Sequence, residues 1–215
     1  MHLVLASNSP RRQQLLRLSG WEFTVQPANI DESIHPGESP ADYVQRVAAG
    51  KAAAITGNGL TLGADTIVIA DGSILGKPAD AAEASAMLAR LRGRPHQVLT
   101  AIAVRMPDGT LLNDHSLDAV PMRNYSNADI EAYVASGDPL DKAGAYAIQH
   151  PGFHPVENFC GCFASVMGLP LCHLVRTLAR QNILPPVDVP SACQAELAYD
   201  CPVFGAVLAA KPQVI

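Results

Sequence analysis

Residues 62–78 read L-G-A-D-T-I-V-I-A-D-G-S-I-L-G-K-P, and the rest of the chain can be arranged around them. Two apolar runs flank the dipeptide Asp71-Gly72, which tolerates positive φ and is typical of a tight hairpin turn. Asp65 stands inside the first run, where burying a carboxylate is costly unless a cation or a hydrogen-bond donor meets it. The second run ends at Lys77. The sequence therefore predicts a hairpin that holds Asp65 and Lys77 near one another, either as a structural ion pair or as part of a site.

The composition of the 215-residue chain is that of a globular protein with a substantial core. Hydrophobic residues make up 48% and charged residues 16%, and the net charge of −5 disfavours a nucleic-acid polymer as partner. No apolar run approaches the roughly 20 residues of a membrane span, and the N-terminus lacks the basic lead of a signal peptide. The five cysteines include no C-x-x-C pair. We therefore expect no disulfide framework, no zinc site and no membrane segment, and a reduced, cytoplasmic protein.

The first helix signal in the chain carries an unusual pair of charges. A short apolar strand at residues 3–6 leads into a turn in which Ser9 suits an N-cap and Pro10 suits the first helical position. Backbone N–H groups at such a turn attract anions. Arg11 and Arg12 oppose the helix dipole there, which a phosphate in front of them would explain. The alternative is a solvated arginine pair that costs the helix a few tenths of a kcal/mol.

Three further polar features could belong to a site or to the surface. Asp31 and Glu32 are adjacent acids in a proline-rich loop, where they could ligate a hard divalent cation or simply be solvated. Lys51 lies near the end of a helix expected over residues 40–55, so taken alone it is expected to complement the helix dipole. Gln149 is expected at the tip of a short strand, where its amide could read a base edge or face water.

The remaining sequence alternates between strand-like and helix-like patterns. Further strands are expected at residues 21–25, 96–104, 110–122 and within 156–166. Helices are expected at residues 10–20, 40–55, 80–92, 126–137 and 168–181. Because the long hairpin of residues 96–122 has helices on both sides in sequence, the sheet should be mixed. We expect one α/β domain, a mixed sheet flanked by helices, over residues 1–184, and a proline-rich tail of unassigned role over 185–215.

The dispersed charges are suited to phosphate chemistry. Neither a G-x-x-x-x-G-K nor a G-x-G-x-x-G pattern occurs, so the usual nucleotide-binding loops are excluded. Cleaving a phosphoanhydride requires charge neutralisation, an aligned water and a base. Carboxylates with a divalent cation supply the aligned water and the base, and arginine and lysine supply the charge neutralisation.

A set of motifs between residues 3 and 180, in order and with consistent spacing, resembles the Maf family. They are A-S-x-S-P-R-R-x-x-L-L at 6–16, D-E at 31–32, G-A-D-T at 63–66, G-K-P at 76–78, R-x-H-x-V-x-T at 94–100, D-K-A-G-A-Y-x-I-Q at 141–149 and G-L-P-L at 168–171. The resemblance implies a mixed α/β fold like that of the inosine triphosphate pyrophosphatases, and a homodimer. It also implies a metal-dependent pyrophosphatase that cleaves nucleoside triphosphates to nucleoside monophosphate and diphosphate.

Position by position, the resemblance implies roles for these residues. The residues of the implied phosphate cradle are Ser7, Arg11 and Arg12. The implied acidic pair, which would bind Mg²⁺ or Mn²⁺ and activate water, is Glu32 and Asp65. The implied catalytic lysines are Lys51 and Lys77.

The same resemblance carries a substrate preference. Arg12, Thr66 and Gln149 match the group that prefers dTTP and UTP, whereas a 7-methyl-GTP-preferring relative would have other residues there. Two positions depart from the family pattern: His150 and Cys162 stand where a glycine and a small hydroxyl residue are more common. These departures concern the shape of the loop near Gln149 and leave the acid–lysine set intact.

Two other functions remain open at this stage. Maf proteins are also described as inhibitors of septum formation, so the chain could act as a binding regulator of cell division. A pure binder, however, has no need of Asp65 among apolar residues. The chain could also hydrolyse modified purine nucleotides such as 7-methyl-GTP or ITP on the same fold.

Overall fold

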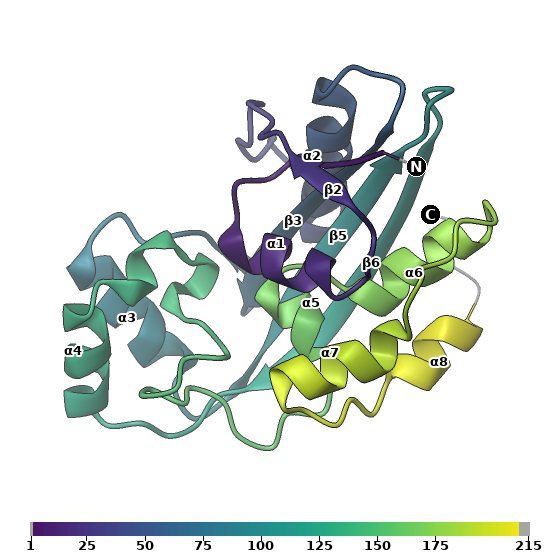
Figure 1. The fold of residues 1–215 in the computed structure, drawn as a ribbon. Coiled ribbons are helices and arrows are strands. Elements are labelled where there is room, and N and C mark those ends of the chain that lie inside the picture. The colour runs from purple at the N-terminus through teal and green to yellow at the C-terminus, as the bar shows by residue number, and fades with distance from the viewer. Residues whose placement is uncertain (1, 211–215) are drawn as a thin grey trace.

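The computed structural model describes residues 2–210, which form a mixed α/β fold around one six-stranded sheet (Figure 1). The strand order is β2-β1-β3-β5-β6, and β4 also pairs with β3. The strands are β1 (Leu3–Leu5), β2 (Phe23–Val25), β3 (Leu60–Ala70), β4 (Ser73–Leu75), β5 (Pro95–Arg105) and β6 (Leu111–Pro121). β1 runs parallel to β2 and β3, and the remaining pairs are antiparallel. The fold class expected from the sequence is confirmed.

Helices cover both faces of this sheet. They are α1 (Pro10–Arg17), α2 (Pro40–Ala54), α3 (Ala81–Leu91), α4 (Asn127–Ala135), α5 (Phe163–Met167), α6 (Leu171–Ala179), α7 (Val189–Leu197) and α8 (Phe204–Ala209), with 3₁₀ turns η1 (Asp138–Asp141) and η2 (Ala143–Ala145). The cap expected at Ser9 is present, and Ser39 and Asp80 cap their helices in the same way: each side chain accepts a hydrogen bond from the backbone N–H of the third helical residue. Serine or aspartate before these helices was therefore a sound guide to where they start.

The hairpin predicted at Asp71-Gly72 is confirmed. The two residues have φ values of 51° and 73°, as a type I′ turn requires, and they connect β3 directly to β4. Their flanking residues Ala70 and Ser73 are paired in the antiparallel register.

The paired partners of β3 leave one part of its edge open. On one side, β1 pairs with residues 60–62 and β4 pairs with residues 68–70. Residues 63–67 therefore have no strand neighbour on that side, although β5 pairs with β3 along the whole of the other edge. Because side chains alternate between the faces of a strand, Asp65 and Thr66 reach this opening from opposite faces of the sheet.

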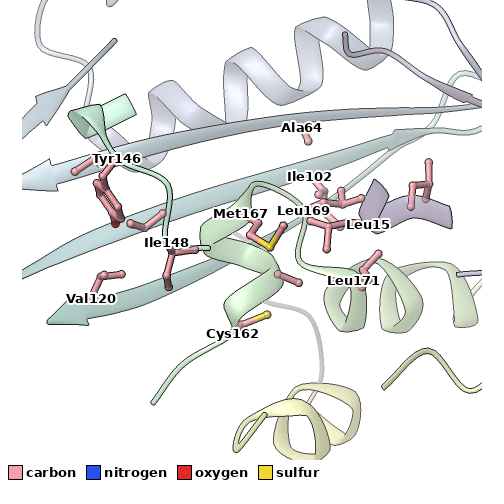
Figure 2. Close-up of a cluster of buried hydrophobic side chains, with 14 of the residues drawn as sticks. Leu15, Ala64, Ile102, Val120, Tyr146, Ile148, Cys162, Met167, Leu169 and Leu171 are labelled. Atoms are coloured by element: carbon pink, nitrogen blue, oxygen red, sulfur yellow. The ribbon is translucent and has the colours of Figure 1, made fainter. Parts of the chain in front are cut away.

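The two largest clusters of buried side chains lie one on each face of the sheet. α2 packs its residues Val44, Val47 and Ala48 against Ile67 and Leu99 on one face. α1, α5 and α6 cover the opposite face, and Figure 2 shows side chains from these helices lying over the strands that carry Ala64 and Ile102. The members labelled there are Leu15, Ala64, Ile102, Val120, Tyr146, Ile148, Cys162, Met167, Leu169 and Leu171.

Two expected strands are absent from the described residues, 2–210. The segment that ends at Gln149 forms two 3₁₀ turns and a further turn, because Gly144 and Ala145 have positive φ values of 68° and 61° that interrupt an extended chain. Residues 156–166 make a single bridge to Met122 and then enter α5. Asn158, with φ of 54°, breaks the extended conformation there.

Residues 185–210 contain the helices α7 and α8 and pack on the helices that cover the sheet. Val189 is buried in the main core, Arg176 Nη1 donates to Val207 O at 3.1 Å, and Gln14 Nε2 donates to Glu196 Oε1 at 2.9 Å. Figure 1 shows α7 and α8 lying together beside α5 and α6. The domain boundary expected at residue 184 stays a prediction.

All five cysteines carry free thiols. Within residues 2–210, no helix combines the length and the apolar character that a membrane crossing requires.

Candidate active site

A cavity of about 730 Å³ opens at the unpaired edge of β3 between β1 and β4. Its walls come from the start of α1, the loop after β2, α2, β3, the segment after β4, the loop of residues 141–149 and the end of α5. The structure brings every residue of the expected site into this one wall: Ser7, Arg11, Arg12, Glu32, Lys51, Asp65, Thr66, Lys77 and Gln149. Their placement is thus established, while the role of each stays a prediction.

An acid–lysine cluster lies at the centre of the cavity wall. Lys51 Nζ donates to Asp65 Oδ1 at 2.9 Å and lies 3.1 Å from Glu32 Oε1. The side chains of Lys51 and Asp65 are 9% and 10% exposed, whereas Glu32 is 49% exposed. The expectation that Lys51 only complements the helix dipole is therefore wrong: its ammonium group is buried between two carboxylates.

Lys77 lines the same cavity as Asp65 but does not form the ion pair with it that the sequence left open. The hairpin does place Lys77 on the same cavity as Asp65, but the ion pair of Asp65 is with Lys51. Lys77 is exposed and makes no ion pair within residues 2–210. The pairing of β4 with β3 ends at Leu75, opposite Val68, whereas α2 lies directly on the face to which Asp65 points.

Gly63 makes the close approach of α2 to β3 possible. A Cβ atom at this position would lie 2.2 Å from Ala48 O and 2.7 Å from Ala52 N, both backbone atoms of α2. Since residues 63 and 65 face the same side of the strand, this contact brings the same turn of α2, which carries Lys51, against Asp65. Nothing in the sequence indicated that α2 makes this close approach to Gly63.

Tyr43 also lines the cavity, although the sequence analysis did not identify it as a site residue. Its hydroxyl donates to Glu32 O at 2.9 Å and so fastens the loop that carries Glu32 to α2. Burial raises the pKa of Tyr43, and the carboxylates of Asp65 and Glu32 add to that shift. The only signal in the sequence was its place on the apolar face of α2, which is shared by ordinary core residues.

The two arginines of α1 have different surroundings. The guanidinium of Arg12 donates through Nε to Gly168 O at 2.9 Å, through Nη1 to Ser7 Oγ at 3.3 Å and through Nη2 to Thr66 Oγ1 at 3.2 Å. Its burial lowers the pKa of Arg12, and the charge of Asp65 opposes that shift. Arg11 lines the cavity without a hydrogen bond or ion pair to any residue of the described chain. Arg11 is consequently the freer of the two for an incoming anion.

The loop of residues 138–149 is built around a buried lysine. Lys142 Nζ donates to Asp138 O at 2.5 Å, to Asp138 Oδ1 at 2.9 Å and to Asp141 Oδ1 at 2.6 Å, so its charge is already neutralised. Tyr133 ties the two ends of the loop together, because its hydroxyl donates to Asp138 Oδ2 at 2.6 Å and accepts from Ala147 N at 3.0 Å. The loop thereby presents Gln149, which is exposed, in a turn at the cavity rim.

The carboxylates of the cavity fit a hard divalent cation that shares its ligands with a substrate. Glu32 and Asp65 both lie within 3.1 Å of Lys51 Nζ, so their oxygens converge on one region. Mg²⁺ is commonly held by one or two carboxylates, with water and phosphate oxygens completing its shell. Within residues 2–210, no group of three or more His, Cys, Asp or Glu side chains is placed to hold a metal ion. A cation here would therefore complete its shell with water and phosphate oxygens.

The fold and the cavity define an α/β protein with a site for an anionic substrate, built from a helix N-terminus and an acid–lysine cluster. The chain belongs to the Maf family, because the family model described as "Maf-like protein" matches residues 2–181. The family membership indicated by the sequence motifs is thus confirmed.

Relatives with curated names are similar along most of their length. A dTTP/UTP pyrophosphatase of Citrifermentans bemidjiense is 46% identical over 181 residues, covering 82% of this chain and 93% of the relative. One from Anaeromyxobacter dehalogenans is 46% identical over 193 residues, covering 87% and 98%. One from Moorella thermoacetica is 47% identical over 184 residues, covering 82% and 93%. Among solved structures, a HAM1 protein from Coxiella burnetii aligns with a TM-score of 0.41 at 17% identity over 70% of this chain and 88% of that one, which is too distant to support an argument.

Proposed function

We propose that this protein is a cytoplasmic nucleoside triphosphate pyrophosphatase that prefers dTTP and UTP and releases nucleoside monophosphate and diphosphate. The observation that carries the proposal is the buried contact of 2.9 Å between Lys51 Nζ and Asp65 Oδ1, at the wall of a cavity large enough for a nucleotide. The named activity of the relatives described above supports the same conclusion.

The geometry suits Asp65 as the general base. Lys51 occupies Oδ1, and Oδ2 makes no hydrogen bond to residues of the described chain, so Oδ2 can accept a proton from water in the cavity. The water oxygen forms a bond to the α-phosphorus, and the bond from that phosphorus to the oxygen bridging the α- and β-phosphates breaks. The proton passes to Asp65, and the electron pair leaves with diphosphate. A positioned base of this kind contributes about 100-fold to 10,000-fold.

The cations of the cavity divide into two groups. Lys51 and Arg12 are already hydrogen-bonded to protein groups and hold the wall in place. Arg11 and Lys77 face the cavity without ion pairs in residues 2–210, and we assign to them the neutralisation of the triphosphate. Ser7, buried in the turn before α1, contributes its hydroxyl beside the N–H groups of the helix start.

Glu32 and Asp65 would hold the divalent cation, Mg²⁺ or Mn²⁺. When bound, such a cation neutralises phosphate oxygens and aligns the attacking water. Without it, two carboxylates would repel a triphosphate, so their position in the wall supports a metal requirement.

We further propose that the enzyme is a homodimer. β6 lies at the end of the sheet order and exposes Leu111 and Leu117 on one face, which supports an apolar contact with a second copy. Sedimentation of the purified protein at micromolar concentration tests this directly, since a monomer at all concentrations contradicts it.

Neither alternative function is favoured by the site. A regulator of septum formation that acts only by binding gives no reason for a carboxylate and an ammonium group to be buried together at a cavity. A purine pyrophosphatase would not be expected to share the named preference of the relatives. Turnover of canonical and modified nucleoside triphosphates with Mg²⁺ or Mn²⁺, on wild type and Asp65→Asn, separates these functions. A folded Asp65→Asn protein with the wild-type kcat would contradict the proposal.

A further inference from the structure

Thr66, which lines the cavity, belongs to a chain of hydrogen bonds that runs away from the cavity into the protein. Arg12 Nη2 lies 3.2 Å from Thr66 Oγ1, Thr66 Oγ1 lies 3.0 Å from Thr100 Oγ1, and Thr100 Oγ1 lies 2.9 Å from Ser165 O. Thr66 and Thr100 are directly opposite one another in the register of β3 and β5. Thr100 is fully buried and does not line the cavity.

The two ends of this chain fix the direction of every hydrogen bond in it. Ser165 O is a backbone carbonyl and can only accept a hydrogen bond. Thr100 must therefore donate its single hydroxyl proton to Ser165 O. A guanidinium can only donate, so Thr66 accepts from Arg12. Either hydroxyl could donate across the 3.0 Å contact between Thr66 Oγ1 and Thr100 Oγ1. Because the proton of Thr100 is directed at Ser165 O, we assign the donor role in that contact to Thr66.

The consequence is that Thr66 has no proton left for a ligand. Its proton is directed at Thr100, one lone pair faces Arg12, and only the second lone pair remains for the cavity. Gly168 closes the space behind this oxygen, because a Cβ atom there would lie 3.4 Å from both Thr66 Oγ1 and Arg12 Nε. Thr66 is therefore presented to the cavity as an acceptor.

We propose that Thr100 is a positioning residue that sets substrate specificity by holding the hydroxyl of Thr66 as an acceptor for a donor on the pyrimidine ring. This inference rests on the proposed function and specifies how the base is chosen. Uracil and thymine carry a proton on N3, which an acceptor can receive, whereas cytosine has a lone pair at N3 that would face the lone pair of Thr66. Two lone pairs that face one another in this way lower the kcat/KM for CTP relative to that for UTP by about tenfold or more.

Removing the hydroxyl of Thr100 should free the hydroxyl of Thr66. In Thr100→Val, Thr66 can rotate and donate its proton into the cavity, so CTP gains relative to UTP. Ser165 O keeps a hydrogen bond, because it also accepts from Gly168 N at 2.8 Å, and the variant is expected to fold. The ratio of kcat/KM for UTP to that for CTP should fall about tenfold. This ratio is independent of the active fraction of the sample, so a merely structural loss does not change it.

Three further variants make the experiment decisive. Thr100→Ser keeps the hydroxyl and should retain the wild-type ratio. Thr177→Val removes another buried threonine hydroxyl, one that donates to Asp114 Oδ2 at 3.0 Å away from the cavity, and should lower stability without moving the ratio. Thr66→Val removes the acceptor itself, and in its background Thr100→Val should have no further effect on the ratio. Thr66→Val alone also tests the proposal should Thr100→Val fail to fold.

Binding measurements separate failure of this inference from failure of the proposed function. Affinities for the non-hydrolysable α,β-methylene analogues of UTP and CTP do not depend on turnover. If wild type binds or turns over the uridine compound better and Thr100→Val narrows the difference, the inference holds. It is overturned if wild type does not distinguish the two compounds, or if Thr100→Val or Thr66→Val keeps the wild-type ratio. If the wild-type protein binds the UTP analogue more tightly than the CTP analogue but turns over neither nucleotide, only the proposed function is contradicted.

Discussion

The ammonium nitrogen of Lys51 lies 2.9 Å from Oδ1 of Asp65, although the two residues are 14 positions apart and belong to a helix and a strand. Both side chains are about nine-tenths buried, and Glu32 adds a second carboxylate at 3.1 Å. An isolated charge at this depth would be strongly destabilising, so the pairing stabilises the wall of the cavity while leaving one oxygen of Asp65 free.

Asp65→Asn is expected to abolish most turnover while the fold is retained. Asparagine is nearly isosteric but cannot take a proton and binds a divalent cation poorly, so kcat should fall about 100-fold to 10,000-fold. The measurement is kcat together with the thermal midpoint. Asp71→Asn is a matched control: Asp71 lies in the exposed β3–β4 turn, bonded to Arg90 and Arg94, and should leave kcat unchanged.

Gly63→Ala is expected to damage both stability and activity. The added methyl group would meet the backbone of α2 at 2.2 Å, so the helix must move away from β3 and carry Lys51 away from Asp65. Such overpacking costs about 1–3 kcal/mol or more in the free energy of unfolding. Gly205→Ala in α8, where a Cβ atom would meet nothing within 4 Å, serves as the control. Equal midpoints and activities for Gly63→Ala and wild type would show that α2 does not depend on this glycine.

Arg11→Ala, Lys77→Ala and Arg12→Ala should separate phosphate binding from wall structure. Arg11 and Lys77 have no ion pairs within residues 2–210, so their removal should lower kcat/KM by a contact worth about 1.5–3 kcal/mol with little change in midpoint. Arg12 loses three hydrogen bonds and should lower the midpoint as well. The family resemblance implied only substrate-binding roles for Arg12, and its three hydrogen bonds lead us to expect an effect on folding as well. An unchanged thermal midpoint for Arg12→Ala would mean that Arg12 binds phosphate without stabilising the fold.

Activity should require a divalent cation, and the cation should bind well only together with a nucleotide. With Glu32 and Asp65 as its sole carboxylate ligands, the protein alone offers an incomplete shell. Titration calorimetry with Mn²⁺ should therefore give weak binding alone and much tighter binding with α,β-methylene-UTP. Glu32→Gln should weaken the second binding event. Full activity in excess EDTA would contradict the metal requirement.

Gln149→Ala should narrow the preference for dTTP and UTP over CTP. The amide N–H of Gln149 at the cavity rim can donate to the 4-carbonyl oxygen of uracil, whereas cytosine has an amine at that position. The expected loss in the ratio of kcat/KM values is about tenfold to a hundredfold. An unchanged ranking at unchanged ratios would mean that Gln149 does not read the base.

Local features were the ones that the sequence predicted well. The hairpin depends on Asp71 and Gly72 alone, and the helix starts depend on a single side chain such as Ser9 or Ser39. Each is decided by neighbours within three residues, so periodicity and turn chemistry were sufficient.

Features that depend on tertiary contacts could not be read in the same way. Lys51 looked like a helix-end lysine because nothing in its neighbourhood indicates that α2 lies on Gly63. Gln149 was placed on a strand because Ala145, at a φ of 61°, gives no sign in sequence of its left-handed conformation. Arg12 looked free because Gly168, whose carbonyl it bonds, is 156 residues away.

The most direct test is steady-state kcat/KM for dTTP, UTP, CTP, GTP, 7-methyl-GTP and ITP, with the products separated and identified. The account predicts nucleoside monophosphate and diphosphate as products, with dTTP and UTP ahead of CTP and of every purine nucleotide by about tenfold or more. Release of nucleoside diphosphate and inorganic phosphate, a preference for CTP or a purine nucleotide, or no turnover with any of them would contradict it.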